Sequence, residues 1–476
     1  MQNLSRLRRT KIVCTLGPAT ASHEKIKELI LAGMDVVRLN FSHGDHESHS
    51  KAVDMIRSAS KEVGKEVGIL QDLGGPKIRL GNLKQKEIKL KPQDKVILRS
   101  GQDSTDDAIP VNYKYLLEDV KENDRILLAD GLVELLVNKI QENDIICEVV
   151  VGGLIHSHKG VNLPSSDLRI SAFTEKDQKD LIIGLKENVD FVALSFVRHE
   201  KDLEQIRQIL SDHEDPPLLI AKIEKPQAVE RLANILELVD GVMVARGDLG
   251  VEMPLEEVPI IQKKIIRMAS EAGKPVITAT QMLRSMVDSP RPTRAEATDV
   301  ANAVLDRTDA VMLSEETAMG SFPIEAVKTL DKIARATEPH IEDQSLLKKA
   351  ISPLLPSKEG AISRSACWLA QDLEASAIAA STTSGRTARL VASFRPHCPI
   401  IGLTTLKRTL RQLTLSWGVI PALVEVFDHT DKMFQGVRSW VLENKIAEKG
   451  DCVIITAGVP LNLKGTTNLL KMLEIK

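Results

Sequence analysis

The sequence predicts an α/β fold: a (β/α)8 TIM barrel with a small β-barrel lid domain inserted into it and an α/β domain at the C-terminus. Short β-branched runs alternate with amphipathic helical patterns, which is typical of βα units on a parallel sheet. Eight such runs occur, as a closed barrel requires. A doubly wound open sheet is the alternative, but it usually has fewer strands and needs a topological switch point.

The barrel strands are expected where apolar runs end in charged or small polar residues. These runs are residues 11–16, 36–41, 67–73, 191–197, 218–224, 241–245, 275–280 and 310–314. Between them, apolar residues recur at three- and four-residue spacing, which predicts helices that cover the sheet. The clearest helical segments are residues 24–32, 47–63, 175–187, 226–238, 259–272 and 294–305.

The alternation of strands and helices stops after the third strand. Residues 74–166 instead contain short strand-like pieces separated by Gly and Asp turns, at residues 87–90, 95–99, 125–128, 132–140 and 145–151. The insertion divides the barrel into residues 1–73 and 167–345. Because a barrel's active site lies at the C-terminal ends of its strands, a domain inserted there can act as a lid.

A second α/β pattern occupies residues 346–476. Its strands are expected at residues 375–381, 399–404, 420–426 and 452–457. We therefore predict a separate C-terminal α/β domain.

The composition is that of an ordinary globular chain of 476 residues, with 43% hydrophobic residues, 27% charged residues and a formal net charge of −3. This charge gives no field that would favour nucleic acid or an anionic membrane. No stretch approaches the roughly 18 apolar residues of a membrane span. The five cysteines are scattered without a C-x-x-C pair, which indicates reduced thiols and a cytoplasmic protein.

Charged residues end two of the predicted strands. The run at residues 218–224 ends in Lys222 and Glu224, and Asp248 follows the run at residues 241–245. Lys222 and Glu224 are two residues apart, so they point to the same side of their strand. Burial of these charges is unfavourable unless something compensates it. A divalent cation between the two carboxylates and a phosphorylated anion beside the lysine would compensate it.

Further polar residues cluster at the ends of other strands. They are Arg38, Asn40, Ser42 and His43 after the second strand, Asp72, Lys77 and Arg79 after the third, Thr280 after the seventh and Ser314 after the eighth. Each of them alone also fits an ion pair or a cap. Because the C-terminal ends of all barrel strands meet at one rim, together with Lys222 they predict an active site there.

These residues lie in stretches that resemble the pyruvate kinase family over nearly the whole chain. The stretches are T-K-I-V-C-T-L-G-P-A-T (residues 10–20), V-V-R-L-N-F-S-H-G (36–44), G-P-K-I-R (75–79), K-G-V-N-L-P (159–164), A-K-I-E (221–224), M-V-A-R-G-D-L-G-V-E (243–252), I-T-A-T-Q-M-L (277–283), P-T-R-A-E (292–296) and V-M-L-S-x-E-T-A (311–318). The resemblance implies a homotetramer that transfers the phosphoryl group of phosphoenolpyruvate to ADP, giving pyruvate and ATP in the last step of glycolysis.

The resemblance also implies a role for each rim residue. Catalysis would depend on Lys222 and Arg38 beside the phosphoryl group, and on Thr280 and Ser314 near the proton path to the enolate. The substrate would be held by Arg38, Lys222, Gly247, Asp248 and Thr280, Mg²⁺ (which Mn²⁺ could replace) by Glu224 and Asp248, and the nucleotide phosphates of ADP or ATP by Asn40, His43, Arg79 and Lys159. No Walker-type phosphate loop is present, so the nucleotide is expected between barrel and lid.

A monovalent cation is expected to be unnecessary. Asn40, Ser42 and Asp72 correspond to the K⁺ ligands of the family. However, the chain resembles the bacterial, K⁺-independent subgroup, because Lys77 stands where K⁺-requiring members carry a glutamate. A fixed ammonium at this position would repel K⁺ and supply the same charge.

A hydroxyl-rich loop in the C-terminal domain predicts an effector site. Its residues are Ser381, Thr382, Thr383, Ser384, Gly385, Arg386 and Thr387, between a predicted strand and a predicted helix. Such a loop can hold a phosphate, although a hydroxyl-rich helix cap is the alternative. By resemblance the loop would bind a sugar phosphate together with Lys464, which would give the domain at residues 346–476 a regulatory role. The sequence leaves open whether that effector is a sugar monophosphate or fructose bisphosphate.

Two other functions stay open at this point. One is a different metal-dependent barrel enzyme that takes phosphoenolpyruvate or pyruvate, such as an aldolase or mutase, although it would not need a lid. The other is a catalytically silent paralogue that binds metabolites, although Lys222, Glu224 and Asp248 are all present.

Overall fold

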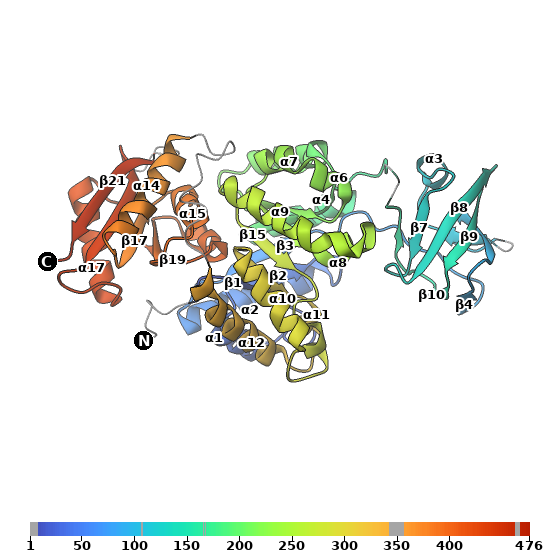
Figure 1. Cartoon of the computed structure of the whole chain (residues 1–476), viewed down its shortest axis with the longest axis horizontal. Helices are drawn as coiled ribbons and strands as arrows, with labels where there is room; N and C mark the ends of the chain where they lie inside the picture. The colour runs from blue at the N-terminus through green and yellow to red at the C-terminus, as the bar shows by residue number, and fades with distance from the viewer. Residues whose placement is uncertain (1–7, 106–107, 165, 167, 342–356, 462–466) are drawn as a thin grey trace.

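The structure is a computed structural model that describes residues 8–105, 108–164, 166, 168–341, 357–461 and 467–476. Three bodies lie in a row along the long axis of the molecule (Figure 1). The barrel is in the centre, the sheets inserted after its third strand lie at one end, and the C-terminal domain lies at the opposite end.

The central body is a closed barrel of eight parallel strands, which confirms the predicted fold class. Around the barrel the strands are β1 (Lys11–Thr15), β16 (Ala310–Leu313), β15 (Val276–Ala279), β14 (Gly241–Ala245), β13 (Leu218–Ile223), β12 (Phe191–Val197), β3 (Gly68–Asp72) and β2 (Val36–Asn40). Each of them matches its predicted run to within one residue at either end. The β-branched runs therefore marked the strands reliably.

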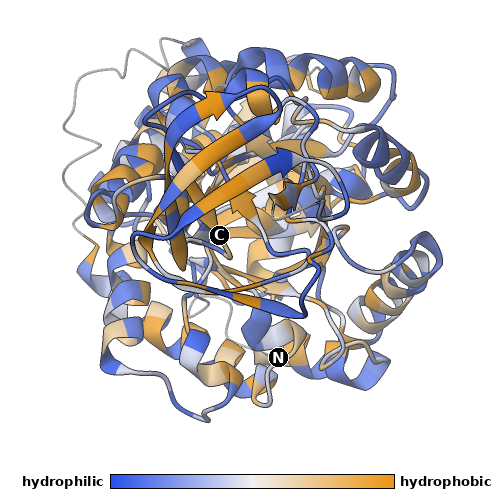
Figure 2. Cartoon of the chain, turned by 90° about the vertical axis from the view of Figure 1, so that its right-hand side faces the viewer, coloured by the Kyte–Doolittle hydropathy of each residue, from blue (hydrophilic) through white to orange (hydrophobic). Residues whose placement is uncertain are grey.

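Helices surround this barrel. They are α1 (His23–Ala32), α2 (His46–Val63), α4 (Glu175–Lys186), α5 (Glu204–Ser211), α6 (Pro226–Glu230), α7 (Leu232–Leu238), α8 (Arg246–Glu252), α9 (Val258–Glu271), α10 (Arg294–Leu305), α11 (Glu315–Ala318) and α12 (Pro323–Thr337). Hydrophilic and hydrophobic segments alternate along them (Figure 2). The single helix predicted at residues 226–238 is wrong, because Arg231, with φ −96° and ψ 15°, separates α6 from α7.

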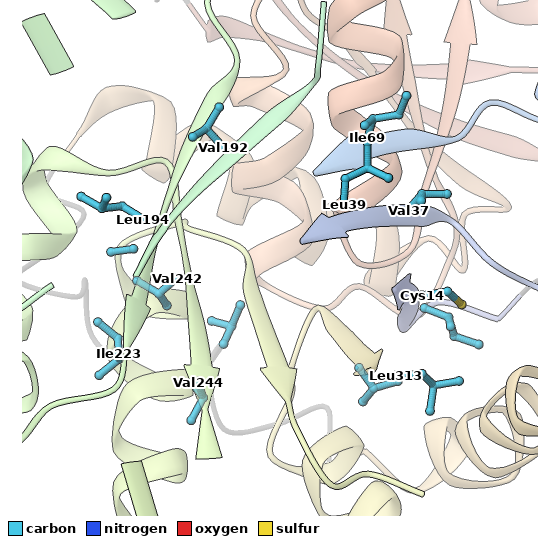
Figure 3. Close-up of a cluster of buried hydrophobic side chains, with 14 of the residues drawn as sticks. Cys14, Val37, Leu39, Ile69, Val192, Leu194, Ile223, Val242, Val244 and Leu313 are labelled. Atoms are coloured by element: carbon cyan, nitrogen blue, oxygen red, sulfur yellow. The ribbon is translucent and has the colours of Figure 1, made fainter. Parts of the chain in front are cut away.

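The barrel strands bury both of their faces. Side chains such as Val37, Ile69, Ile223 and Val244 point outward into the layer beneath the helices (Figure 3). The alternate residues, such as Ile220, form a second cluster inside the barrel. Side chains on a strand alternate with a period of two. Polar residues in step with the inner cluster therefore continue it at the C-terminal rim, and these are Arg38, Asn40, Asp72, Ser195, Lys222 and Glu224.

The inserted segment between β3 and α4 folds into two small sheets. A six-stranded sheet has the order β11 (Val161–Asn162), β7 (Arg125–Leu128), β8 (Val133–Gln141), β9 (Asp144–Val151), β5 (Lys95–Ser100) and β6 (Ala108–Val111), and β10 (Gly153–His156) pairs with β4 (Glu87–Leu90). The short helix α3 (Leu116–Asp119) follows β6. These sheets enclose a core of their own. We refer to this segment as the lid.

The C-terminal body is a five-stranded sheet between helices. Its order is β19 (Val419–Leu423), β18 (Ile400–Thr404), β17 (Ala377–Ser381), β20 (Cys452–Gly458) and β21 (Thr467–Glu474), and its helices are α14 (Lys358–Asp372), α15 (Arg386–Ser393), α16 (Lys407–Gln412) and α17 (Thr430–Glu443). β21 was not predicted, because its Leu, Met, Lys and Glu residues favour a helix. Antiparallel pairing with β20 overrides this preference.

The C-terminal body packs against the N-terminal ends of the barrel strands. Leu415 belongs to the cluster inside the barrel. Arg411 Nε donates to Asp190 Oδ1 at 2.7 Å, directly before β12, and Lys11 Nζ donates to the carbonyl of Val419 at 2.8 Å. No helix in the described parts of the chain has the length and apolar character that a membrane span requires.

Candidate active site

A continuous chain of charged side chains lies at the C-terminal rim of the barrel. Arg38 Nε donates to Asp72 Oδ2 at 2.6 Å, and Lys222 Nζ lies 3.3 Å from Asp72 Oδ1. Lys222 Nζ also lies 2.8 Å from Glu224 Oε1. Asp72, Lys222 and Glu224 are all buried. The structure therefore brings together four residues that the sequence placed on three different strands.

These four side chains carry two positive and two negative charges, and Asp248 adds a further negative charge beside them. Burial would lower the pKa of Lys222, but Asp72 and Glu224 outweigh it and raise that pKa. Burial would raise the pKa of Asp72, but Lys222 and Arg38 lower it. By contrast, the pKa of Glu224 is raised by burial and, despite Lys222, further raised by the nearby carboxylate of Asp248. Negative charge is therefore in excess at Glu224 and Asp248.

This excess of negative charge fits a divalent cation. Glu224 and Asp248 are oxygen ligands, and Mg²⁺ usually binds a protein through one or two carboxylates while it keeps several waters. No cluster of three or more His, Cys, Asp or Glu side chains suited to a metal occurs in the part of the chain that the structure describes. In the usual coordination of Mg²⁺, the remaining positions would belong to substrate and water.

Two residues of β12 support this chain of charges, and sequence analysis missed both. Ser195 Oγ accepts a hydrogen bond from Lys222 Nζ at 2.7 Å and donates one to the carbonyl of Leu73 at 2.7 Å. The backbone N–H of Phe196 donates to Glu224 Oε2 at 2.8 Å. A serine inside the apolar run of β12, in step with Lys222 on the next strand, was the available signal.

Thr280 and Gly247 are hydrogen-bonded to each other. The N–H of Gly247 donates to Thr280 Oγ1 at 2.7 Å, and Thr280 Oγ1 donates to the carbonyl of Ala279 at 2.6 Å. Thr280 has φ +68°, which is a strained conformation for a β-branched residue and costs about 1–3 kcal/mol. Such strain is concentrated at functional sites.

Ser314 lies at the end of β16. Its Oγ is buried and has no hydrogen-bond partner among the residues that the structure describes. A buried hydroxyl without a partner is unfavourable and requires an explanation. A ligand at the rim would supply the missing partner.

A cavity of about 360 Å³ lies between the lid and the barrel rim. Its lining includes Arg79, Lys159, Arg198, Lys225 and Asp248. Arg79 forms an antiparallel bridge with Gly160, so two of the predicted nucleotide residues lie on the paired segments that enter and leave the lid. The cavity therefore combines cationic side chains with one of the two acidic residues described above.

The other two predicted nucleotide residues, Asn40 and His43, lie outside this lining. Asn40 Oδ1 accepts a hydrogen bond from the N–H of Ser42 at 3.1 Å. His43 is exposed, and its pKa is lowered first by partial desolvation and then by the positive charges of Lys77, Arg79 and Arg38. The rim between β2 and the lid is thus strongly cationic.

Family models match the chain in two parts: the barrel domain of pyruvate kinase over residues 7–327 and its alpha/beta domain over residues 360–473. The chain belongs to the pyruvate kinase family. A pyruvate kinase of Clostridium perfringens is 44% identical over 98% of this chain and 100% of its own length. Pyruvate kinase 2 of Synechocystis is 47% identical over 100% of this chain and 81% of its own length.

A solved structure agrees with these relatives. The crystal structure of a pyruvate kinase from Cryptosporidium parvum superposes with a TM-score of 0.94 at 38% identity, covering 100% of this chain and 98% of that chain. As a member of the pyruvate kinase family, the chain is a phosphotransferase.

Two of the three residues predicted to hold a monovalent cation in this pyruvate kinase family member already have partners within the chain. Both oxygens of Asp72 contact cationic side chains, and the amide oxygen of Asn40 is hydrogen-bonded to Ser42. Lys77 lies in the cavity wall. Although it is exposed, partial desolvation and the charges of Arg79 and Lys222 lower its pKa. Lys77 is therefore within electrostatic reach of the rim.

The hydroxyl-rich loop of this pyruvate kinase family member joins β17 to α15. Gly385 adopts a left-handed conformation with φ +78°, and no side chain among the described residues caps α15. Thr387 Oγ1 is hydrogen-bonded to Thr467 Oγ1 at 2.7 Å, and Thr409 Oγ1 donates to the carbonyl of Thr383 at 2.8 Å. Lys464, the other predicted effector residue, lies outside the described residues.

A second cavity, of about 300 Å³, lies between this loop and the barrel. Its lining includes Ser384, Arg386, Arg389, Lys274 and Asp240. Burial and the charge of Arg386 lower the pKa of Arg389, and Asp240 only partly offsets them. Arg389 Nη1 is buried without a partner among the described residues. Positive charge in this cavity is therefore incompletely compensated.

Proposed function

We propose that the chain transfers the phosphoryl group of phosphoenolpyruvate to ADP, giving pyruvate and ATP in a Mg²⁺-dependent reaction that ends glycolysis. The observation that carries the proposal is the position of Lys222. Its ammonium lies between Asp72 and Glu224, beside Asp248, at the rim below the lid cavity. Two cationic side chains and two acidic metal ligands on one rim fit an anionic phosphorylated substrate.

Lys222 and Arg38 would stabilise the phosphoryl group during transfer. Negative charge is spread over the equatorial oxygens of this group, so cations already in position lower the barrier. Asp72 contacts both side chains and therefore orients them. The elevated pKa of Lys222 keeps its ammonium protonated for this role.

Glu224 and Asp248 would hold Mg²⁺, which, when bound, neutralises charge on the phosphoryl and substrate oxygens. The high pKa of Glu224 supports this assignment, because a nearby cation would stabilise its charged form. The N–H of Phe196 would hold the carboxylate of Glu224 in position, and the hydroxyl of Ser195 would hold the ammonium of Lys222.

Thr280 and Gly247 would bind the carboxylate of phosphoenolpyruvate. In the structure the N–H of Gly247 donates to the Thr280 hydroxyl. Both groups could donate to the substrate carboxylate instead. After phosphoryl transfer the enolate must be protonated at carbon. The strained Thr280 and the unpartnered hydroxyl of Ser314 are the groups we assign to that proton path.

The nucleotide would occupy the cavity between lid and barrel. Arg79 and Lys159 line it from the lid side, and His43 and Asn40 would approach the phosphates from β2. Closure of the lid would exclude water from the reacting phosphoryl group.

The function is tested by following pyruvate formation from phosphoenolpyruvate, with Mg²⁺ and with or without ADP. We expect pyruvate only when ADP is present. Pyruvate formed without ADP would favour another enzyme of phosphoenolpyruvate. No pyruvate under either condition would favour a metabolite-binding protein without turnover.

We also propose that K⁺ is not required, and this leads to a test at Lys77. Activity in a tetramethylammonium buffer should equal that in K⁺ to within about twofold, because the ammonium of Lys77 supplies the charge of a monovalent cation. Lys77→Glu should create a requirement for K⁺, with activity rising on the order of tenfold or more when K⁺ is added at constant ionic strength.

The matched control is Lys86→Glu, which makes the same charge change at an exposed lysine elsewhere in the lid. It should leave the enzyme independent of K⁺. A many-fold rise of wild-type activity on adding K⁺ would show that this assignment of Lys77 is wrong.

A sugar phosphate is the effector that we propose for residues 381–387. The uncapped start of α15 and the partly uncompensated charge of Arg389 both favour an anionic ligand in this region. Thr383→Glu should abolish activation by sugar phosphates through repulsion of the phosphate, with effector-free turnover changed by less than about twofold. Thr383→Val, which adds no charge, is the control. An unchanged activation curve for Thr383→Glu would remove the loop from the effector site.

We also propose that the protein is a cytoplasmic homotetramer. The exposed side chains of Leu255, just beyond α8, and Ile260, in the first turn of α9, fit a contact within a homotetramer. All five cysteines are free, and four of them are buried, which fits a cytoplasmic protein.

A further inference from the structure

Two polar side chains beside the lid cavity have no part in the proposed reaction, yet they join the lid to the barrel. Asn162 Nδ2, in β11 of the lid, donates to Oε1 of Glu252, the last residue of α8, at 2.7 Å. The same oxygen lies 2.7 Å from Lys225 Nζ. Figure 1 shows α8 at the side of the barrel that faces the lid. We call Asn162, Glu252 and Lys225 the latch.

The carboxylate of Glu252 depends on these two contacts. Glu252 and Lys225 are both buried, and Glu252 Oε2 has no partner among the described residues. A buried carboxylate is unfavourable unless it is paired and hydrogen-bonded. The amide of Asn162 is therefore a substantial part of what holds Glu252 in place, and it comes from the lid.

The latch is close to both acidic residues assigned to Mg²⁺. Asp248 and Glu252 are four residues apart on α8, so they share one face of the helix and are separated by about one turn of 5.4 Å. Lys225 directly follows Glu224, and its Nζ lies 5.9 Å from the ring centroid of Phe196. Phe196 in turn donates its N–H to Glu224.

A second contact places the lid on the same helix. Gly131, between β7 and β8, has φ +85°, and a Cβ added there would lie 3.6 Å from Val251 Cγ1. The lid thus lies beside two consecutive residues of α8, with Gly131 next to Val251 and Asn162 hydrogen-bonded to Glu252. A lid that moves away would lose both contacts together.

We propose that Asn162 and Glu252 are positioning residues that couple lid closure to the metal site. When the lid lies on α8, Asn162 holds Glu252, and Glu252 and Lys225 hold Asp248 and Glu224 in the arrangement that binds the divalent cation. This inference rests on the proposed function, because it uses the assignment of Glu224 and Asp248 to the metal.

The test is Asn162→Leu, which keeps the size of the side chain and removes the amide donor. We expect amide hydrogen exchange in β11 and in residues 128–133 of the ligand-free chain to accelerate about tenfold, because the lid loses its hydrogen bond to Glu252. We also expect the dissociation constant of Mn²⁺, measured by electron paramagnetic resonance, to rise about threefold to tenfold. Asn162→Gln keeps an amide donor and should recover part of both effects.

The matched control is Asn138→Leu. Asn138 is exposed, and its amide donates to Glu148 within the lid, so this variant should match wild type in both measurements. Faster lid exchange with unchanged Mn²⁺ affinity would show that Asn162 only fastens the lid, and it would overturn the coupling. Wild-type values in both measurements would show that the hydrogen bond between Asn162 and Glu252 does not hold the lid on α8.

The test does not depend on a single variant or on catalytic activity. Should Asn162→Leu fail to fold, Asn162→Ser removes the same donor with a smaller side chain, and the same outcomes apply. Neither readout requires turnover. A wild-type chain that makes no pyruvate would therefore contradict the proposed function while leaving the latch to be judged by lid exchange and Mn²⁺ affinity.

Discussion

Lys222→Met should lower turnover by about 10²-fold to 10³-fold or more, because its ammonium acts where charge develops in the transition state. The chain should still fold, since Asp72 keeps its contact with Arg38. Binding of phosphoenolpyruvate in the presence of Mg²⁺ should persist. Steady-state kinetics and isothermal titration calorimetry would measure these two properties separately.

The control is Lys179→Met, the same change at an exposed lysine of α4, which should leave turnover at the wild-type value. Retention of a tenth of wild-type turnover by Lys222→Met would contradict the assignment of Lys222. Loss of phosphoenolpyruvate binding together with turnover would instead mean that Lys222 holds the substrate in its ground state.

Asp248→Asn should raise the Mg²⁺ concentration that gives half-maximal activity by about tenfold to a hundredfold, because it removes ligand charge and almost no volume. The thermal midpoint should change little, since Asp248 is only half-buried and takes part in none of the ion pairs described above. Activity measured over a Mg²⁺ titration would show the shift. Saturating Mg²⁺ should restore part of the activity.

Glu256→Gln, at an exposed acidic residue just beyond α8, is the control and should leave the titration unchanged. An Asp248→Asn enzyme with the wild-type Mg²⁺ requirement would place the metal elsewhere.

Much of the rim could be predicted from the sequence because two regularities act together. Parallel strands of a closed barrel end at the same rim, and side chains on each strand alternate with a period of two. These regularities were enough to place Arg38, Asp72, Lys222 and Glu224 on one side of one rim, which the structure shows as a continuous chain of ion pairs.

The supporting contacts could not be predicted in the same way. Ser195 sits in an apolar run, and its spacing indicates only that it faces the same side as Lys222, not that its hydroxyl accepts a hydrogen bond from Lys222. The N–H of Phe196 is a backbone group, so no residue type indicates its bond to Glu224.

The contact between Asn162 and Glu252 joins residues 90 positions apart in the sequence and depends on how the lid is seated. Residue type and spacing constrain positions along an element well. They constrain contacts between separate domains only weakly, since these are decided by three-dimensional packing.

The pairing of β1 with β16 and the position of Leu415 inside the barrel determine the order in which a growing chain can complete its hydrophobic cores. The lid strands pair with one another within residues 87–162, so their core can form early during synthesis. The barrel closes only when Lys11 meets Ala310, and its interior is filled only when Leu415 has left the ribosome. While residues 163–415 are being made, the nascent chain therefore carries a complete lid core beside a barrel whose interior is not yet filled. The C-terminal domain, which emerges last, completes that interior.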